Sequence, residues 1–303
     1  MKRLIVAACC LASATASAAE PTRAQLEERL NTLENTLAGD VCLDPRAARA
    51  VLEARLPGDT SAAPATDRPT AATRAALPAD ASALPRNELV ALLKQAVVLV
   101  LTPSGSGSGF FVNADTVVTN AHVVADAGGK ILLIGPGVRG AVTARVIAQQ
   151  GGGEGIQDRD YALLRSERPG SATLPLTVQA TELEPVVAAG FPGLLLDNDI
   201  EFQRILRGKP EGLPDLSLSQ GNIMAVQNRA SRMPTIAHSA AISAGNSGGP
   251  LVDTCGRVLG VNSFLRVAAD QGTHAGFAIA ADDILRFLAE QGMRPVVAEG
   301  SCR

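Results

Sequence analysis

Two stretches near the start of the chain repeat apolar residues at helical spacing. In residues 22–38, leucines recur every three or four positions, which places them on one face of a helix. The stripe covers two heptads, fewer than a coiled coil needs, so we expect either a helix that packs on its neighbour or one that self-associates. Residues 45–56 predict a second helix, with Asp44 as its N-cap and Pro45 in its first turn. The leucines of the stripe are Leu26, Leu30, Leu33 and Leu37.

Apolar runs typical of strands occupy the middle of the chain. Residues 97–101 (VVLVL) predict a buried strand, preceded by a short helix that Asn87 caps. Residues 110–112 and 117–118 predict a hairpin, because the turn-forming segment 113–115 separates these two apolar runs.

The C-terminal part continues with strands and one helix. Residues 161–164 predict a short buried strand led by Asp160, and residues 283–291 predict a closing helix. The single Tyr and the seven Phe residues all lie at or after Phe110, and only two of the 29 glycines precede residue 86. The turn-rich globular domain is therefore expected in this part of the chain.

Residues 57–85 separate the two helical stretches from that domain. They hold five prolines and ten alanines in 29 residues, a composition typical of a flexible or extended linker. We therefore divide the chain into a signal peptide (1–19), a helical N-terminal region (20–56), a linker (57–85) and a folded domain (86–298).

The first residues have the pattern of a secretory signal. Lys2 and Arg3 precede an apolar core at residues 4–11, and the small residues 16–18 (ASA) form a cleavage site. Cys9 offers an alternative, lipoprotein-type processing site, but its apolar core would be short. We expect an exported protein, periplasmic or secreted. Cleavage leaves 25 Lys+Arg (27 minus 2) against 30 Asp+Glu, a net charge of −5.

Composition excludes several classes of function. The hydrophobic fraction of 46% allows a sizeable core, and the formal charge of −3 gives no basic excess for nucleic-acid binding. No stretch after the signal reaches the roughly 18 apolar residues of a membrane span. Three cysteines remain after cleavage, which in an exported protein suggests one disulfide and one free thiol, or a bond between chains. The sequence leaves the pairing open among Cys42, Cys255 and Cys302, and their wide spacing argues against a zinc site.

The most informative motif is GNSGGP at residues 245–250. A serine hydroxyl is a weak nucleophile that needs a base and nearby hydrogen-bond donors for the developing oxyanion, and the glycines around Ser247 let backbone N–H groups turn toward one point. Upstream, His122 follows the predicted hairpin and Asp160 leads a predicted strand. Each residue alone has an ordinary structural explanation, but the order His, Asp, Ser is one that serine peptidases use.

These residues resemble the trypsin-like serine peptidases, and most closely their bacterial Deg/HtrA type. The similar segments are GSGSGF (105–110), TNAHVV (119–124), DYALL (160–164), GNSGGPL (245–251), GVNS (260–263) and GFAIA (276–280). The matches run in order over about residues 97–290. The resemblance implies a mainly β fold of two six-stranded antiparallel barrels, preceded by the helical N-terminal region and the linker. The Gly-rich residues 105–109 lack the Lys-Ser/Thr pair of a phosphate loop.

The resemblance also implies a role for each site residue. Ser247 would be the nucleophile, His122 the general base and then the acid, and Asp160 the residue that orients His122. The backbone N–H groups of Gly245 and Ser247 would form the oxyanion hole. The resemblance places the substrate pocket at Ala241, Asn262, Ser263 and Phe264.

The implied activity is an exported serine endopeptidase acting on unfolded or exposed segments of protein and peptide substrates. It needs no metal and no other cofactor. The pocket offers no carboxylate, so we expect an aliphatic residue before the scissile bond, unless His238 recruits an acidic one. His238 and His274 lie near the expected site, where either could contact substrate, but we expect structural roles for both. A catalytically silent or self-inhibited binding protein on the same fold is the alternative.

Three departures from the resembled family stand out. Tyr161 occupies a position where a small apolar residue is more usual, and no PDZ domain is expected in the few residues after the closing helix. Residues 192–234 are longer and less regular than the usual connection. Because loops in this region shape the specificity pocket, the activity of the resting site is left open.

Overall fold

A computed structural model describes the folded part of the chain. The described residues are 80–151, 159–208, 212–229, 233–267 and 274–303. The expected signal peptide, the helical region, most of the linker and Cys42 lie outside them. None of the helices within these ranges is long and apolar enough to cross a membrane.

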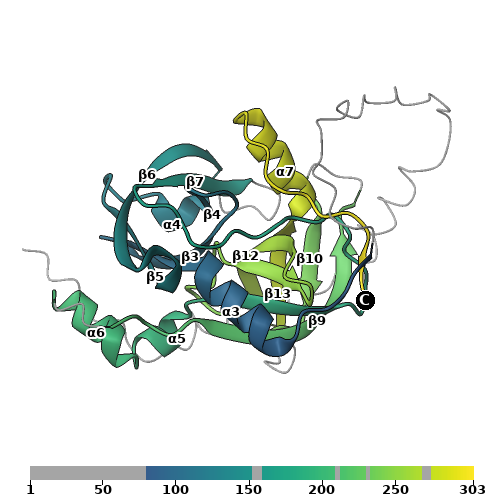
Figure 1. The fold of residues 1–303 in the computed structure, drawn as a ribbon, viewed down its shortest axis with the longest axis horizontal. Helices are drawn as coiled ribbons and strands as arrows, with labels where there is room; N and C mark the ends of the chain where they lie inside the picture. The colour runs from purple at the N-terminus through teal and green to yellow at the C-terminus, as the bar shows by residue number, and fades with distance from the viewer. Residues whose placement is uncertain (1–79, 152–158, 209–211, 230–232, 268–273) are drawn as a thin grey trace, which may run out of the picture. The chain divides into compact units, whose positions relative to one another are not determined.

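Six antiparallel strands close into a first barrel in the order β2-β3-β4-β7-β6-β5 (Figure 1). The strands are β2 (Val97–Thr102), β3 (Gly105–Phe111), β4 (Thr116–Thr119), β5 (Ile131–Gly135), β6 (Gly140–Gly151) and β7 (Asp160–Ser166). The strand predicted at residues 97–101 is therefore the first of this barrel. Its run of consecutive apolar residues reflects burial on both faces: Val98 and Val100 belong to the barrel core, and Leu99 to a cluster outside it.

Six more antiparallel strands close into a second barrel, in the order β10-β13-β12-β11-β8-β9. The strands are β8 (Pro185–Gly190), β9 (Ser217–Gln227), β10 (Thr235–His238), β11 (Pro250–Asp253), β12 (Val258–Val267) and β13 (His274–Ala280). The fold of two six-stranded antiparallel barrels is thus confirmed. A shared apolar cluster, which includes Leu99 and Phe110 of the first barrel and Val187 and Val252 of the second, joins the two.

Short helices connect and cover the barrels. They are α3 (Arg86–Ala96), α4 (Ala121–Val124), the 3-10 turn η1 (Pro136–Val138), α5 (Gly193–Leu196), α6 (Ile200–Leu206) and α7 (Ala281–Glu290). The predicted closing helix is α7, which begins two residues earlier than expected. Tyr161 is fully buried and stacks on Phe287 of α7, with ring centroids 5.6 Å apart. This unusual aromatic residue therefore fastens α7 to the first barrel.

Two details differ from the sequence-based expectation. Helix α3 already begins at Arg86, after Pro85, so Asn87 lies inside its first turn and is not its cap. The segment 192–234 is not irregular throughout, because it contains α5, α6 and the barrel strand β9. Strand β9 has a weak apolar pattern because most of its residues are only half-buried and carry small or polar side chains.

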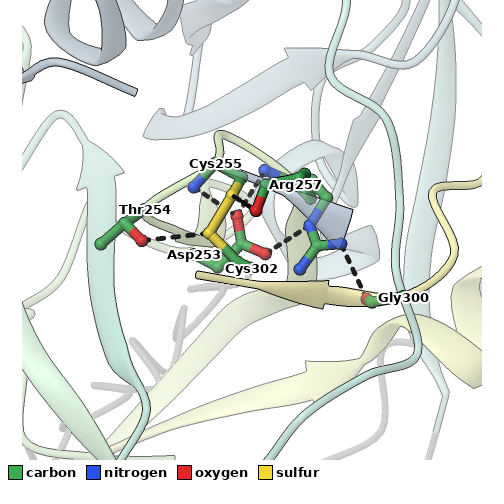
Figure 2. The surroundings of a disulfide bond; sticks show 7 residues. Asp253, Thr254, Cys255, Arg257, Gly300 and Cys302 are labelled. Carbon is green, nitrogen blue, oxygen red and sulfur yellow. Dashed lines mark hydrogen bonds and ion pairs between the residues drawn. A yellow bond between two sulfur atoms is a disulfide. The ribbon is translucent and has the colours of Figure 1, made fainter. Parts of the chain in front are cut away.

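A disulfide between Cys255 and Cys302 holds the C-terminal segment against the β11–β12 turn (Figure 2). Cys302 lies in β14 (Ser301–Cys302), which pairs in parallel with β1 (Asp80–Ala81). The same turn accepts a second contact, because the Leu84 N–H donates to the Thr254 carbonyl at 2.9 Å. Both ends of the folded part are therefore anchored at one turn.

We predict that Cys302→Ser lowers the free energy of unfolding by about 2–4 kcal/mol, the usual range for removing a native disulfide. The bond closes a loop over a sequence separation of 47 residues, so its loss restores considerable entropy to the unfolded chain. Urea unfolding followed by circular dichroism measures the change. Reductant should lower the free energy of unfolding of the wild type by the same amount and should not change that of Cys302→Ser. Equal stability of the two proteins without reductant would contradict the prediction.

Candidate active site

His122 and Asp160 meet at one end of the first barrel. Strand β4 pairs with β7, and Thr119 lies opposite Ala162, so the short helix α4 that follows β4 carries His122 back over the start of β7. The Nδ1 atom of His122 lies 2.7 Å from Asp160 Oδ2, and the His122 backbone N–H donates to Oδ1 at 3.0 Å. The His122 side chain is 46% exposed. A substrate could therefore reach the imidazole while the carboxylate stays covered.

Asp160 is buried but keeps its charge. Burial raises its pKa, but hydrogen bonds from the His122 side chain and backbone, the charge of His122 and a hydrogen bond from Ser263 outweigh burial, so the net pKa is lowered. A carboxylate that accepts from Nδ1 fixes the tautomer in which Nε2 is free to take a proton.

Ser247 lies between β10 and β11 of the second barrel, and Ser263 of β12 connects it to Asp160. The Ser247 hydroxyl donates to the Ser263 carbonyl at 3.1 Å, and the Ser263 hydroxyl donates to Asp160 Oδ2 at 3.1 Å. Within the described residues, no hydrogen bond joins the Ser247 hydroxyl to His122. Such bonds are often long in unliganded sites and tighten when substrate binds. The three residues expected to act together are therefore gathered across the junction of the two barrels.

The peptide groups around Ser247 are anchored by their carbonyls. The Ala244 carbonyl accepts from Gly193 N–H at 2.8 Å, and the Asn246 carbonyl accepts from Gly249 N–H at 2.9 Å. The N–H groups of the same two peptide units belong to Gly245 and Ser247, and among the described residues neither has an acceptor. A peptide group held by its carbonyl keeps its N–H in a fixed direction. Two anchored peptide groups whose N–H donors have no acceptor are what an oxyanion hole requires.

Gly245 sits in a turn that only glycine accommodates well. The Asn246 N–H donates to the Ser243 carbonyl at 3.0 Å, and Gly245, the third residue of this turn, has a φ of 95°. These are features of a type II turn, which needs a positive φ at that position. A Cβ at Gly245 would also collide with the Phe191 carbonyl and the Gly193 nitrogen.

The four expected pocket residues have different surroundings. Ala241 is exposed, and Ser263 is half-buried and bound to Asp160. Asn262 is fully buried: its amide nitrogen donates to the Pro250 carbonyl at 3.1 Å, and its oxygen lies 3.1 Å from His238 Nε2. Phe264 lies on β12, where its Cα pairs with that of Phe277.

His238 is fully buried beneath this region and faces Asn262. Since the Asn262 oxygen accepts, His238 donates from Nε2. Burial lowers the pKa of His238 from its ordinary 6.5 to about 4, although the Asn262 hydrogen bond opposes the shift. The imidazole is therefore neutral at neutral pH, which removes the positive charge that an acidic substrate side chain would need.

This buried imidazole predicts a specific acid sensitivity. The folded pKa lies below the ordinary value, so the unfolded chain binds more protons between about pH 6.5 and pH 4, and stability falls as pH decreases through that window. The loss is on the order of 3 kcal/mol. His238→Gln keeps an N–H donor toward Asn262 but does not titrate. Urea unfolding at pH 7 and pH 4 should show a smaller acid loss in this variant; parallel profiles would contradict the prediction.

Asn120 is a supporting residue that no sequence motif singled out as functional. It is fully buried, and its amide nitrogen donates to the Asp160 carbonyl at 2.7 Å. The bond fixes the backbone of Asp160 next to α4. The only sequence feature that points to a role for Asn120 is its place directly before Ala121 and His122 in the TNAHVV segment.

The chain is similar to known proteins of one family. Residues 107–261 match the family described as "Trypsin-like peptidase domain". The chain is 32% identical over 203 residues to Serine protease HTRA1 of Xenopus laevis, covering 66% of this chain and 39% of that protein. It is 35% identical over 190 residues to the mitochondrial Serine protease HTRA2 of Bos taurus, covering 61% and 36%. The chain therefore spans less than two fifths of the length of these relatives.

Solved structures support the fold alone. The crystal structure of the Rv3671c protease of M. tuberculosis in its inactive form aligns with a TM-score of 0.51 at 23% identity. The alignment covers 70% of this chain and 98% of that structure.

Proposed function

The chain belongs to the trypsin-like peptidase family, and on this premise we propose that it is a serine endopeptidase working through an acyl-enzyme. Ser247 attacks the peptide carbonyl, and His122 accepts its proton and later gives it to the leaving amine. Asp160 orients His122 and stabilises its charged form. The N–H groups of Gly245 and Ser247 bind the oxyanion that develops on the carbonyl oxygen.

The observation that carries the proposal is the 2.7 Å contact between His122 Nδ1 and an ionised Asp160. A histidine held in this way keeps Nε2 free as a proton acceptor, and its exposed ring can approach both a substrate and a serine.

A fluorophosphonate probe tests the proposal directly, because it bonds only to a serine whose proton is removed by a base. We expect labelling of the wild type and none of Ser247→Ala, whose turnover of unfolded casein should fall about a millionfold. Ser239→Ala removes a hydroxyl from an exposed serine of the same barrel and should leave labelling unchanged. A folded wild type that neither labels nor cleaves casein would overturn the proposal.

One observation favours a second candidate, a self-inhibited protein on the same fold. The Ser247 hydroxyl donates to the Ser263 carbonyl, an interaction that must break before His122 can take the proton. In that case labelling would be slow in the resting protein and would accelerate when a peptide ligand is added.

We also propose export, with unfolded or exposed protein segments as substrates. The motives are the charged start, apolar core and small-residue site of residues 1–18, together with the HtrA-type relatives. The intact mass of protein recovered from outside the cytoplasm should correspond to a chain that starts near Ala19 or Glu20. A mass that retains residues 1–18, or a lipid on Cys9, would contradict export by this route.

We predict a preference for small or medium aliphatic residues immediately before the scissile bond. Ala241 offers only a methyl group, and His238 is neutral and buried at neutral pH, so neither can pair with a charged substrate side chain. Cleavage-site profiling with a peptide library measures the preference at pH 7. A profile dominated by Lys, Arg or Glu would contradict it, and Glu would implicate His238.

A further inference from the structure

Ser108 of β3 lies within the Gly-rich segment at residues 105–109 that the proposed chemistry does not use. It is fully buried, although it belongs to the first barrel and the serine-bearing loop belongs to the second. Gly107, which directly precedes Ser108, lets the two approach closely. A Cβ at Gly107 would lie 2.6 Å from a Val123 methyl carbon and 3.2 Å from the Ser247 carbonyl oxygen. Only glycine therefore fits beside this serine.

Every polar group of Ser108 is hydrogen-bonded, and three of the four bonds involve the loop around Ser247 or the segment beside it. The hydroxyl donates to the Gly245 carbonyl at 2.6 Å and accepts from the Phe191 N–H at 2.9 Å. The Ser108 N–H donates to the Ser247 carbonyl at 2.8 Å. The fourth bond, from the Thr119 hydroxyl to the Ser108 carbonyl at 2.7 Å, fixes Ser108 within its own barrel.

Ser108 holds two peptide groups of the loop, 245–246 and 247–248. Each lies next to a peptide group that carries an expected oxyanion donor, the N–H of Gly245 or of Ser247. The peptide between Gly245 and Asn246 is held at its carbonyl by the Ser108 hydroxyl and at its N–H by the Ser243 carbonyl. The peptide between Ser247 and Gly248 is held at its carbonyl by the Ser108 N–H and at its N–H by the Asn262 carbonyl. The peptide group between them presents the Ser247 N–H, and its direction depends on both neighbours.

A loop of this composition needs such restraint. Three of the five residues at positions 245–249 are glycines, which adopt many backbone conformations, and Gly245 already has a positive φ. Rotation of the peptide groups on either side of Gly245 would turn its N–H away from the oxyanion position. The Ser108 hydroxyl reaches across the barrel junction to the Gly245 carbonyl and restrains this rotation.

We propose that Ser108 is a positioning residue for the oxyanion hole, which it holds in a binding-competent geometry without touching the substrate. This role rests on the proposed peptidase function. A residue that only packs in the core contributes to stability. Loss of the Ser108 hydroxyl should instead weaken interactions that the enzyme makes only with the transition state.

The variants are Ser108→Ala and the control Ser166→Ala. Ser166 is also a buried serine of the first barrel, and its hydroxyl donates to the Arg168 carbonyl at 2.6 Å and accepts from the Arg168 N–H at 3.3 Å. It lies at the far end of β7 from Asp160, so its substitution removes a similar pair of hydrogen bonds away from the loop. Ser108→Cys keeps a weak donor of similar shape and serves if Ser108→Ala does not fold.

Steady-state kinetics on an aliphatic peptide substrate give the first result. Losing one oxyanion donor costs about 10²–10³-fold in kcat, and Ser108 acts on the donors indirectly, so we expect kcat of Ser108→Ala to fall about 10–100-fold with KM nearly unchanged. Affinity for a peptide boronic acid, which forms a tetrahedral adduct on Ser247, should fall by a similar factor. Affinity for the matching unreactive peptide amide should not change. Ser108→Cys should be intermediate, and Ser166→Ala should match the wild type.

Hydrogen exchange gives a second result that does not require catalysis. Peptides covering residues 243–249 should exchange faster in Ser108→Ala than in the wild type, and at the wild-type rate in Ser166→Ala. Wild-type kcat and wild-type exchange in Ser108→Ala would overturn the positioning role while leaving the peptidase proposal intact. An equal loss of kcat in both alanine variants would also overturn it, by assigning the effect to general stability. An inactive wild type with faster exchange in Ser108→Ala would overturn the peptidase proposal, and with it any catalytic meaning of the restraint.

Discussion

Asp160→Asn is expected to lower kcat by about 10⁴-fold while leaving the fold intact. Both carboxylate oxygens of Asp160 accept: Oδ1 from the His122 backbone N–H, and Oδ2 from His122 Nδ1 and the Ser263 hydroxyl. The backbone N–H can only donate, so the amide oxygen of the asparagine must stay at the Oδ1 position. Its NH₂ group then faces Nδ1 and requires that atom to accept. The ring proton moves to Nε2, which can no longer take the proton of Ser247.

Initial rates on a peptide substrate, with circular dichroism to confirm folding, measure the loss. Asp115→Asn is the matched control, because Asp115 pairs with Arg165 in the same barrel and its side chain is 41% exposed, away from the site. It should retain wild-type kcat. A decrease of less than tenfold in Asp160→Asn would argue against the role of His122 as the base.

Arg257→Met is expected to lower the free energy of unfolding by about 3–5 kcal/mol. Asp253 and Arg257 are almost completely buried beside the disulfide, and Arg257 Nε donates to Asp253 Oδ2 at 2.6 Å (Figure 2). Arg257 also donates to the Gly300 carbonyl at 2.9 Å. Burial raises the pKa of Asp253 even though hydrogen bonds and charge from Arg257 oppose the shift. Without the guanidinium, a carboxylate is left buried with no countercharge.

Urea unfolding at pH 7 measures this change against Arg165→Met, which breaks the exposed pair with Asp115 and should cost less than about 1 kcal/mol. The double substitution Asp253→Leu with Arg257→Met should recover much of the loss, because no charge then remains buried. Equal stability of Arg257→Met and Arg165→Met would show that the buried carboxylate finds another partner.

The chain's local patterns predicted individual strands, and the family resemblance that they carry implied the architecture of two barrels and a set of candidate site residues. Consecutive apolar runs such as residues 97–101 predicted strands buried on both faces, and β2 occupies that position. The order of His122, Asp160 and Ser247 indicated a peptidase because each residue sits in a short, recognisable motif. Such signals are local, so they can be read without knowing which strands pair.

Other features depend on residues far apart in sequence, and only the tertiary structure decided them. The pairing of Cys255 with Cys302 follows from β14 lying beside the β11–β12 turn, which no cysteine spacing specifies. Strand β9 has a weak apolar pattern, and it is defined by its pairing with β8 and β10 in the closed barrel.

The same reason applies to the support of the candidate site. Ser108 and Gly245 are 137 residues apart, yet they share a 2.6 Å hydrogen bond once the two barrels pack together. Ser263 likewise links Ser247 to Asp160 only because β12 of the second barrel passes the start of β7 in the first. The sequence determined which chemical groups are present and in which local conformations. Packing of the barrels determined which of these groups meet, because hydrogen bonds act over about 3 Å irrespective of distance along the chain.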